Sequence, residues 1–309
     1  MPAELLIADV PWLLYRSYFA LPKSIVDADG QPVNALLGTV NAILSVLDAR
    51  LPARPVRGVV ACMGAEEASY RVRLYPAYHA HRDPMPPELA AQWKKAPQLL
   101  ASLGWTYATS AELEADDVMF SYAQEEAERG GRALLLTGDR DLFGAVGEDV
   151  AVIELKKSPT HPAHGEIGPA QVRERYGVEP EQVPDFIALR GDPSDGLPGA
   201  PGIGAKTAAE LLREHGTLEA LLSAAGADAD AEDSAAAAVR ATTVMRPRIA
   251  VALRENAELL RTFKQIATLQ RIDVEPAPDR ATDYAGGARM AGELGMRRLA
   301  ERLEKLAAG

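Results

Sequence analysis

Four short runs of acidic residues are the part of this sequence best suited to chemistry. The runs are Asp9; Glu114, Asp116 and Asp117; Asp139 and Asp141; and Asp192 and Asp195. Like charges packed this closely repel one another unless a cation lies among them, and oxygen-rich acidic sites suit Mg²⁺ or Mn²⁺. Two such ions are a common apparatus for cutting phosphodiesters. The pattern therefore predicts metal-dependent phosphoryl chemistry.

Each run also has a simpler interpretation. An aspartate at the end of a strand, such as Asp9, can merely begin a turn. The acids at 114–117 suit the first turn of a helix because the helix dipole favours negative charge there. Gly138 lets the backbone turn tightly, but a capped turn needs only one of Asp139 and Asp141. The number of acids, rather than any single one, favours the metal interpretation.

Alternating strands and helices must position these acids. The expected strands are Leu5–Val10, Val56–Met63, Ala133–Leu136 and Val150–Leu155, and the expected helices are Val33–Leu51, Glu114–Arg129 and Pro169–Tyr176. Continuous apolar strands between helices indicate an α/β fold with a mainly parallel sheet. Its active site should lie beyond the carboxyl ends of the strands, where Asp9 and Asp139 stand. After about Val178 the chain reads as helical, with an amphipathic pattern over Arg246–Gln270 and a loop or exposed helix over Gly226–Ala238.

Composition narrows the class of protein. The 309 residues, 47% of them hydrophobic, can form one large or two ordinary domains. A single cysteine, Cys62, excludes an intramolecular disulfide and a cysteine-based zinc site. The start MPAELLIADV lacks the pattern of a signal peptide, and no apolar run is long enough to span a membrane. We expect a cytoplasmic protein with no membrane partner.

The net charge of −11 is opposite to the basic surface that a nucleic-acid partner usually meets. The eight clustered acids supply most of that charge, however, and two divalent cations would offset half of theirs. Local patches must therefore decide. Segment 70–82 interleaves arginines and histidines with tyrosines, as binding of a single strand or a frayed end requires, and Lys94 and Lys95 continue it. The simpler alternative is a solvated loop with tyrosines facing the core.

A glycine-rich segment follows Asp195. It reads Pro-Gly-Ile-Gly-Ala-Lys-Thr over residues 201–207. A glycine-rich hairpin that opens a helix exposes backbone N–H groups, which bind phosphate well, and Lys206 adds a positive charge. This string beside two acids predicts a helix-hairpin-helix that binds a DNA backbone.

Together these strings resemble the 5′ nuclease family, which includes flap endonucleases, phage 5′ exonucleases and the 5′ nuclease domain of bacterial DNA polymerase I. E-A-D-D, T-G-D-R-D-L-F and R-G-D-P-S-D-G-L-P-G-A-P-G-I-G-A-K-T-A occur in the family's order. The resemblance runs from Leu5 to about Leu269. It implies a PIN-like domain at 1–178 with a helical arch around 70–100, and a helical domain at 179–309 with a helix-3-turn-helix module at about 184–222. Since no polymerase region follows, we expect a stand-alone nuclease.

The resemblance also assigns roles to residues. The eight clustered acids, Asp9, Glu114, Asp116, Asp117, Asp139, Asp141, Asp192 and Asp195, match the family's metal cluster. Arg71, Tyr78 and Arg82 match catalytic positions in and before the arch: the arginines would steady the phosphate, and Tyr78 would stack on an unpaired base. The DNA-binding residues would be His79, Gly202, Gly204, Lys206 and Thr207, and relatives can hold a monovalent cation such as K⁺ at this hairpin.

Two departures from the family pattern bear on activity. Relatives usually carry an aspartate shortly after strand two, but this chain has Met63-Gly64-Ala65-Glu66-Glu67, so Glu66 or Glu67 would have to replace it. The arch pattern Y-K-x-N-R has become Tyr78-His79-Ala80-His81-Arg82, which puts a histidine where a lysine is usual. If the missing acid weakens a metal site, Mn²⁺ should support more activity than Mg²⁺, and Gly64→Asp should increase the Mg²⁺-supported rate.

The sequence thus predicts a monomeric, structure-specific 5′ nuclease that uses two or more Mg²⁺ or Mn²⁺ ions. Its substrates would be DNA 5′ flaps, 5′ ends and RNA primers in replication and repair. Two alternatives remain: a DNA-junction-binding protein weakened in catalysis by the missing aspartate, and a PIN-type ribonuclease. The hairpin at 199–207 argues against the second.

Overall fold

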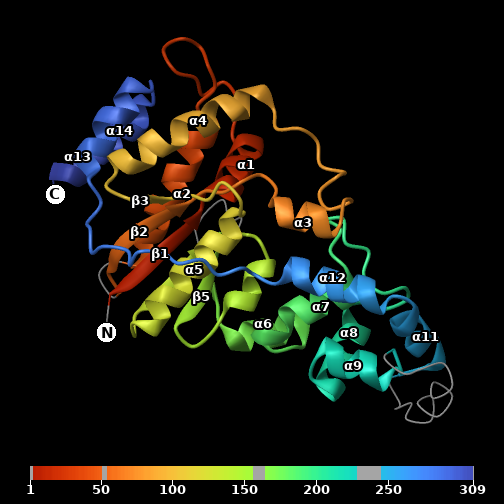
Figure 1. Cartoon of the computed structure of the whole chain (residues 1–309). Coiled ribbons are helices and arrows are strands. Elements are labelled where there is room, and N and C mark those ends of the chain that lie inside the picture. The colour runs from red at the N-terminus through yellow and green to blue at the C-terminus, as the bar shows by residue number, and fades with distance from the viewer. Residues whose placement is uncertain (1–2, 51–53, 156–163, 228–244, 309) are drawn as a thin grey trace.

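The centre of the molecule is a six-stranded sheet with the order β3-β2-β1-β4-β5-β6 (Figure 1). The computed structural model describes residues 3–50, 54–155, 164–227 and 245–308. The strands are β1 (Glu4–Asp9), β2 (Val56–Cys62), β3 (Thr106–Ala108), β4 (Arg132–Leu136), β5 (Val150–Leu155) and β6 (His164–Ile167). β1 to β5 are parallel, and β6 pairs antiparallel with β5. The four predicted strands are confirmed, and the mainly parallel α/β fold with them.

β3 and β6 were not predicted, because strands of three and four residues leave too little periodicity to detect. The strand order reverses between β1 and β4, which is where ligands bind in open α/β sheets.

Helices cover both faces of the sheet and build the second half of the chain. They are α1 (Val10–Ala20), α2 (Asn34–Arg50), α3 (Ser69–Leu74), α4 (Pro87–Ser102), α5 (Ala115–Glu128), α6 (Pro169–Tyr176), α7 (Val183–Arg190), α8 (Ala205–His215), α9 (Leu218–Ala224), α11 (Pro247–Glu255), α12 (Ala257–Ala267), α13 (Tyr284–Glu293) and α14 (Arg297–Ala308). The predicted helices at 33–51, 114–129 and 169–176 are confirmed as α2, α5 and α6, with small shifts of the first two. The predicted pattern at 246–270 forms two helices, which meet at Asn256.

The alternation of side chains along β1 separates two cores. Leu5 and Ile7 join the core that includes α5 and the helical second half, whereas Leu6 and Ala8 join the core beneath α1, α2 and α4. Both cores include residues with essentially no exposed surface. A strand buried on both faces holds its end rigidly, so Asp9 at the end of β1 has a fixed position.

The segment predicted as an arch contains most of α3 and of α4, joined by residues 75–86, which form turns and extended chain rather than a helix. Pro84, Pro86 and Pro87 explain this break, because proline disfavours helical backbone in the residue before it. In Figure 1 this connection passes beside the carboxyl ends of the strands as it runs from α3 to α4.

The predicted hairpin module lies within α7, α8 and α9. The turn between α7 and α8 carries left-handed glycines at Gly191, Gly196, Gly199 and Gly202. α7 packs against α12 through a 2.7 Å ion pair between Asp185 and Lys264. Most of the predicted loop or helix at 226–238 lies outside the described residues.

The C-terminal helices return to the first half of the chain. Ala288 and Leu303, from α13 and α14, lie in the same core as α2 and α4 (Figure 1). The division of the chain into two domains at residue 178 stays a prediction. The packing of α13 and α14 against the first half is a feature that this division did not include. Among the described residues, no helix has the length and apolar character that crossing a bilayer requires.

Candidate active site

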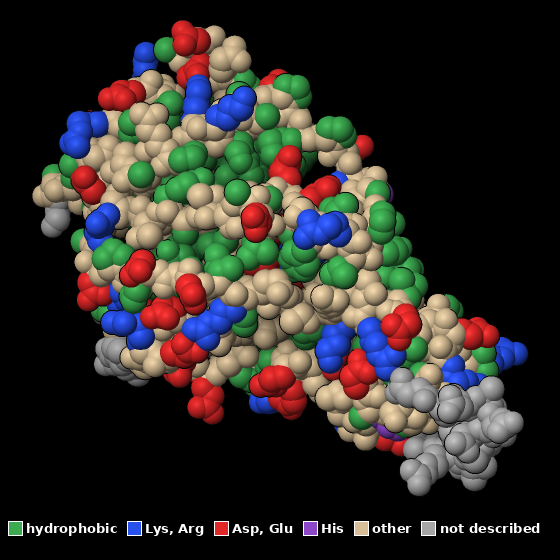
Figure 2. All heavy atoms as spheres, viewed as in Figure 1, with side chains coloured by type: hydrophobic (Ala, Val, Ile, Leu, Met, Phe, Trp, Pro, Cys, Tyr) green, Lys and Arg blue, Asp and Glu red, His purple; other side chains and the backbone are tan. Residues whose placement is uncertain are grey.

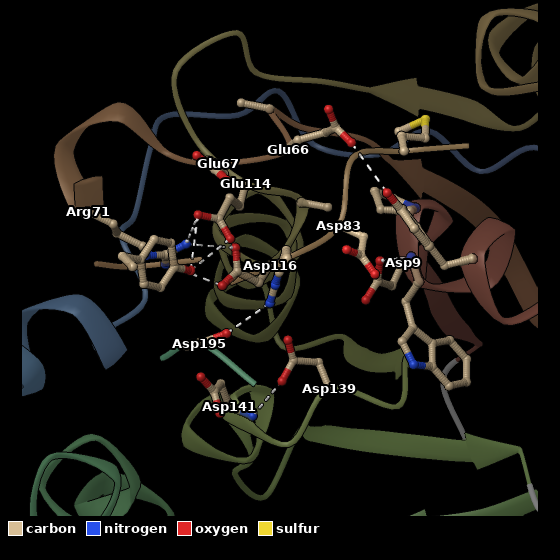
Figure 3. Close-up of a pocket in the computed structure, with 18 of the residues that line it drawn as sticks. Asp9, Glu66, Glu67, Arg71, Asp83, Glu114, Asp116, Asp139, Asp141 and Asp195 are labelled. Carbon is tan, nitrogen blue, oxygen red and sulfur yellow. Dashed lines mark hydrogen bonds and ion pairs between the residues drawn. The ribbon is translucent and has the colours of Figure 1, made fainter. Parts of the chain in front are cut away.

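A pocket of 1110 Å³ opens at the carboxyl ends of the strands, and six of the eight predicted acids line it: Asp9, Glu114, Asp116, Asp139, Asp141 and Asp195. They come from the end of β1, the start of α5, the segment after β4, and the turn between α7 and α8. In Figure 3, Asp139 and Asp141 lie across the pocket from Glu114 and Asp116. Segments up to 186 residues apart in the sequence therefore meet at one edge of the sheet.

Hydrogen bonds to one threonine organise the first group of acids. Asp9 Oδ2 accepts a 2.7 Å bond from the Thr137 hydroxyl, and its Oδ1 accepts the Trp12 N–H at the start of α1. The Thr137 hydroxyl in turn accepts the Asp139 N–H, and Asp139 Oδ1 accepts the Asp141 N–H. The ends of β1 and β4 are thereby joined. Among the described residues, no cationic side chain forms an ion pair with Asp9, Asp139 or Asp141.

The second group of acids surrounds Arg71. Its guanidinium lies 3.1 Å from Glu114, 3.3 Å from Asp116 and 3.0 Å from Asp117, and its Nε donates to the Ile266 carbonyl of α12. Only 2% of the Arg71 side chain is exposed. Arg71 lies at the wall of the pocket, but acids and a carbonyl already occupy its donors, and its predicted role in steadying the phosphate stays a prediction. Its first effect is to hold carboxylates in place.

Asp195 has cationic or polar partners of its own. Its Oδ1 lies 3.0 Å from His79 Nε2 and 3.0 Å from the Arg82 guanidinium, which also donates to the Ser194 carbonyl. Burial opposes ionisation, but the hydrogen bond from His79 and the charge of Arg82 lower the pKa of Asp195 below its ordinary value. This carboxylate is therefore ionised and tied to the base of the arch.

The acids without cationic partners have raised pKa values. Burial, partly offset by hydrogen bonds from Thr137 and Trp12, raises the pKa of Asp9 to about 6. Enclosure in the pocket and the charges of neighbouring acids raise the pKa of Asp139 to about 7, although its side chain still contacts solvent. Burial and the charge of Asp139 raise the pKa of Asp141 well above its ordinary value. Burial is the largest cause of each of these three shifts, and the negative charges of neighbouring acids add to it.

The donor set fits a divalent cation. Asp9, Asp139 and Asp141 offer only oxygen atoms, in a pocket where a positive charge would relieve their mutual repulsion. Within the described residues, no three acidic, histidine or cysteine side chains already converge closely enough to hold one ion. Water or substrate oxygens would therefore complete the coordination, as is usual for Mg²⁺.

Three residues predicted for this site, Asp117, Asp192 and His79, lie outside the pocket lining. Asp117 is fully buried behind Arg71, where its Oδ1 accepts the Gln270 N–H. Asp192 caps its own turn by accepting the Ser194 N–H and pairs with Arg190. Tyr78 does line the pocket, but only 4% of it is exposed, and His79 is 1% exposed. The predicted stacking of Tyr78 on a base and the predicted contact of His79 with DNA do not fit this burial.

The hairpin residues lie apart from the pocket lining. Gly202 has a φ of +77°, and Gly204 precedes the first residue of α8. A Cβ at either glycine would meet no atom within 4 Å, so their backbone is open to a partner. Lys206 is exposed in the first turn of α8, and Thr207 beside it is half-buried.

The structure explains the missing aspartate after β2. A Cβ at Gly64 would lie 2.5 Å from both the Ala115 nitrogen and the Glu114 carbonyl carbon. The start of α5 therefore occupies the space that a side chain at 64 would need. Glu66 and Glu67 do line the pocket, and the Tyr15 hydroxyl lies 3.4 Å from Glu66. The expectation that Gly64→Asp increases activity does not fit this packing.

An aromatic wall of the pocket was missed by the sequence analysis. Trp12, Tyr15 and Phe19 of α1 line it with Trp93 of α4, and Phe19 is 72% exposed. The spacing of three and four residues after Asp9 was the available signal, because it places three aromatic rings on one side of a helix that begins at a predicted metal ligand. Trp93 gave no such signal.

Comparisons with known proteins agree with this arrangement. The chain matches the family model of the 5′-3′ exonuclease N-terminal resolvase-like domain over residues 4–177, and that of the 5′-3′ exonuclease C-terminal SAM fold over residues 178–282. It is 36% identical to DNA polymerase I of Mycobacterium tuberculosis over 219 residues, which are 71% of this chain and 24% of that protein. It is 35% identical to the 5′-3′ exonuclease of the same organism over 243 residues, covering 73% of this chain and 74% of the relative. The chain spans about a quarter of the length of the polymerases that it matches.

Solved structures share the fold at low identity. The T5 5′-exonuclease with bound zinc has a TM-score of 0.61 at 17% identity and covers 98% of this chain and 99% of its own. The catalytic core of Rad2 in complex with DNA has a TM-score of 0.61 at 14% identity and covers 98% of this chain and 92% of its own. From the matches to both family models and the geometry of the acidic pocket, we conclude that the chain belongs to the 5′-3′ exonuclease family.

Proposed function

We propose that the protein is a structure-specific 5′ nuclease that hydrolyses DNA phosphodiesters with the help of divalent metal ions. One observation carries this proposal most strongly: Asp9, Asp139 and Asp141 meet in one pocket without a cationic partner among the described residues. Acids that only stabilise a fold are normally paired when enclosed, as Asp117 is by Arg71. A bound Mg²⁺ or Mn²⁺ would activate a water molecule and offset charge on the attacked phosphate.

The chain's own side chains would orient the reaction. Thr137 holds Asp9 and the loop of Asp139 in register, and Arg71 holds Glu114 and Asp116 opposite them. Arg82 is a cation of the arch that lines the pocket and has room to meet a phosphate, since 46% of its side chain is exposed. Asp117 and Asp192 would support the site from behind.

The substrate would combine a duplex with an unpaired 5′ strand. Open backbone at Gly202 and Gly204, with Lys206 and Thr207 on the first turn of α8, suits the phosphates of a duplex, and K⁺ would bind at this turn. The aromatic wall of Trp12, Tyr15, Phe19 and Trp93 offers ring faces to unpaired bases of any sequence. 5′ flaps, 5′ ends and RNA primers on DNA share this form.

The distribution of charge suits local rather than general binding of DNA. On the face drawn in Figure 2, Lys and Arg side chains are interspersed with Asp and Glu rather than gathered into one basic area. Binding should therefore depend on a few phosphate contacts. We expect Lys206→Ala to lower the salt dependence of duplex binding by about one unit of log K per log salt; an unchanged slope would remove the hairpin from the interface.

Cleavage of an end-labelled 5′-flap duplex, with Mg²⁺ and Mn²⁺ compared, tests the proposal. We expect metal-dependent cutting near the junction and none in EDTA. Flap binding without cutting in either metal would favour the alternative of a catalytically weakened junction-binding protein, for which the glycine at position 64 is the supporting observation. Preferential cutting of single-stranded RNA of the same sequence would indicate a PIN-type ribonuclease. Sedimentation with and without the flap would test the expected monomer.

A further inference from the structure

A stacked pair of side chains, Tyr78 and His79, lies between two acids of the pocket. His79 has a φ of +56° and is the one non-glycine residue with positive φ among the described parts of the chain. This backbone conformation is energetically unfavourable for a non-glycine residue. Such strain persists only where the surrounding structure over-determines it, and it clusters at functional sites. His79 is also where the family pattern has a lysine.

The contacts of the pair run from one side of the pocket to the other. The Tyr78 hydroxyl donates to Glu114, 3.1 and 3.2 Å from its two carboxylate oxygens. The Tyr78 and His79 rings stack with their centres 3.8 Å apart. His79 Nε2 lies 3.0 Å from Asp195 Oδ1, and the His79 N–H donates to the Asp195 carbonyl at 3.2 Å. Because the ionised Asp195 can only accept, His79 Nε2 carries a hydrogen.

The turn that carries Asp195 packs closely against this part of the arch. A Cβ at Gly196 would lie 3.0 Å from the Ala77 carbonyl oxygen. The backbone of residues 77–79 and the turn at 195–196 are thus in direct contact, and His79 adds a side-chain bond to that contact. Any shift of the arch base would therefore move Asp195.

We propose that Tyr78 and His79 are positioning residues that fix Glu114 and Asp195 on facing sides of the pocket. Tyr78 lines the pocket but is only 4% exposed, and His79 is 1% exposed, so the two rings act through the two carboxylates. In this protein the histidine joins the arch to the turn after α7 through a rigid ring, where a lysine would offer a flexible side chain. The inference rests on the proposed nuclease activity, and its test includes a measurement that does not depend on cleavage.

Three substitutions at His79 distinguish the contributions of the hydrogen bond to Asp195, of the positive-φ backbone and of side-chain packing. Gln places its amide nitrogen about where His Nε2 lies and can donate to Asp195. Leu has similar bulk but no donor. Asn adopts positive φ more readily than most residues, but its amide is too short to reach Asp195. Tyr78→Phe removes only the hydroxyl that contacts Glu114, and His81→Leu repeats the histidine-to-leucine change at an exposed neighbour.

The readouts are kcat and KM on the flap duplex, and Mn²⁺ binding to the DNA-free protein followed by electron paramagnetic resonance. We expect kcat to fall by about 10- to 100-fold in His79→Leu and His79→Asn, since a displacement of about 1 Å can cost 100-fold. His79→Gln should recover most of that loss, and Tyr78→Phe should lose about tenfold. KM should stay within about twofold in the variants of the pair, Mn²⁺ affinity should weaken in step with kcat, and His81→Leu should bind Mn²⁺ as the parent does.

Each other outcome overturns the inference. Asparagine adopts positive φ readily but cannot reach Asp195. An unchanged kcat and Mn²⁺ affinity in His79→Asn would therefore mean that Tyr78 and His79 only fill space in the core. A raised KM and a smaller salt dependence with normal kcat would make His79 a DNA contact. If the parent cuts no substrate, the proposed function fails, but Mn²⁺ affinity still decides the positioning role: equal affinity in all variants contradicts it.

Discussion

The two ends of strand β1 carry acids with opposite surroundings. Glu4, at its first residue, is 1% exposed and contacts three arginines: Arg50 at 2.7 Å, Arg54 at 3.7 Å, and Arg132. Arg50 and Arg132 also bind Glu166 of β6. Asp9, at the last residue of the strand, is 6% exposed and accepts hydrogen bonds from neutral groups only.

This difference indicates that Glu4 stabilises the fold, whereas Asp9 is suited to bind a cation. Around Glu4 every charge has its counterpart, and the arginines lower the pKa of Glu166 against the effect of burial. Burial, with a smaller contribution from the charge of Asp116, raises the pKa of Asp9 to about 6. Enclosed charge without a partner is costly, so a fold retains it where a cation from outside supplies the compensation.

The largest expected effect comes from neutralising acids at the carboxyl end. Asp139→Asn with Asp141→Asn should lower the rate of flap cleavage by about 1,000-fold or more, because several kcal/mol of transition-state stabilisation by metal would be lost. The metal-free double variant should unfold at the same temperature as the parent or a higher one, since two repelling charges are gone. Cleavage near the parent rate would remove both residues from the metal site.

Metal-free stability should fall as pH rises. The folded-state pKa of Asp9 is about 6 and that of Asp139 about 7, against ordinary values of 3.8. Above these ordinary values the unfolded chain binds fewer protons than the folded one, so stability is lost between about pH 4 and 7. Asp9 alone would contribute about 3 kcal/mol.

Urea unfolding in EDTA from pH 5 to 7.5 would measure this loss, and Asp9→Asn should flatten the profile. Added Mg²⁺ should restore stability at pH 7.5. A stability that increases with pH over this range would contradict the proposed lack of compensation.

Glu4→Gln should show the reverse behaviour of the Asp139 and Asp141 changes. Removing the acid leaves Arg50 and Arg132 with fewer partners in a largely buried site, which should cost about 2–3 kcal/mol of unfolding free energy. kcat per folded molecule should not change. Glu258→Gln, whose partner Arg261 lies in an exposed pair, is the matched control and should leave stability unchanged. If Glu4→Gln and Glu258→Gln changed the free energy of unfolding equally, Glu4 would not stabilise the fold more than an exposed acid does, and the proposed difference between the ends of β1 would be wrong.

The smallest expected effect concerns the vacancy after β2. Gly64→Ala should destabilise the protein by about 1–3 kcal/mol, because its Cβ would push against the backbone of Glu114 and Ala115. Cleavage should fall as Glu114 moves. Gly147→Ala is the control, since its Cβ would meet nothing within 4 Å. If Gly64→Ala left the stability unchanged, or if Gly64→Asp remained active, the start of α5 would have to move aside at little cost in free energy.

The sequence alone predicted most of the fold and the core of the site. Apolar runs gave β1, β2, β4 and β5, and acids at the ends of two of them placed the pocket correctly. The strings at 114–117, 137–143 and 190–208 were specific enough to indicate the family. The short strands β3 and β6 were not predicted, because three or four residues are too few to show a clear hydrophobic period.

Only the tertiary structure decided which acids have partners. Asp117 and Asp139 look alike in sequence, but a buried arginine 46 positions earlier pairs with Asp117, and no described cation pairs with Asp139. Likewise, the space at Gly64 is filled by the start of α5, and the rings of Tyr78 and His79 turn inward between Glu114 and Asp195. Sequence determines which groups exist and the local period of the chain; distances between segments far apart in the chain determine which charges are compensated, and those arise only from packing.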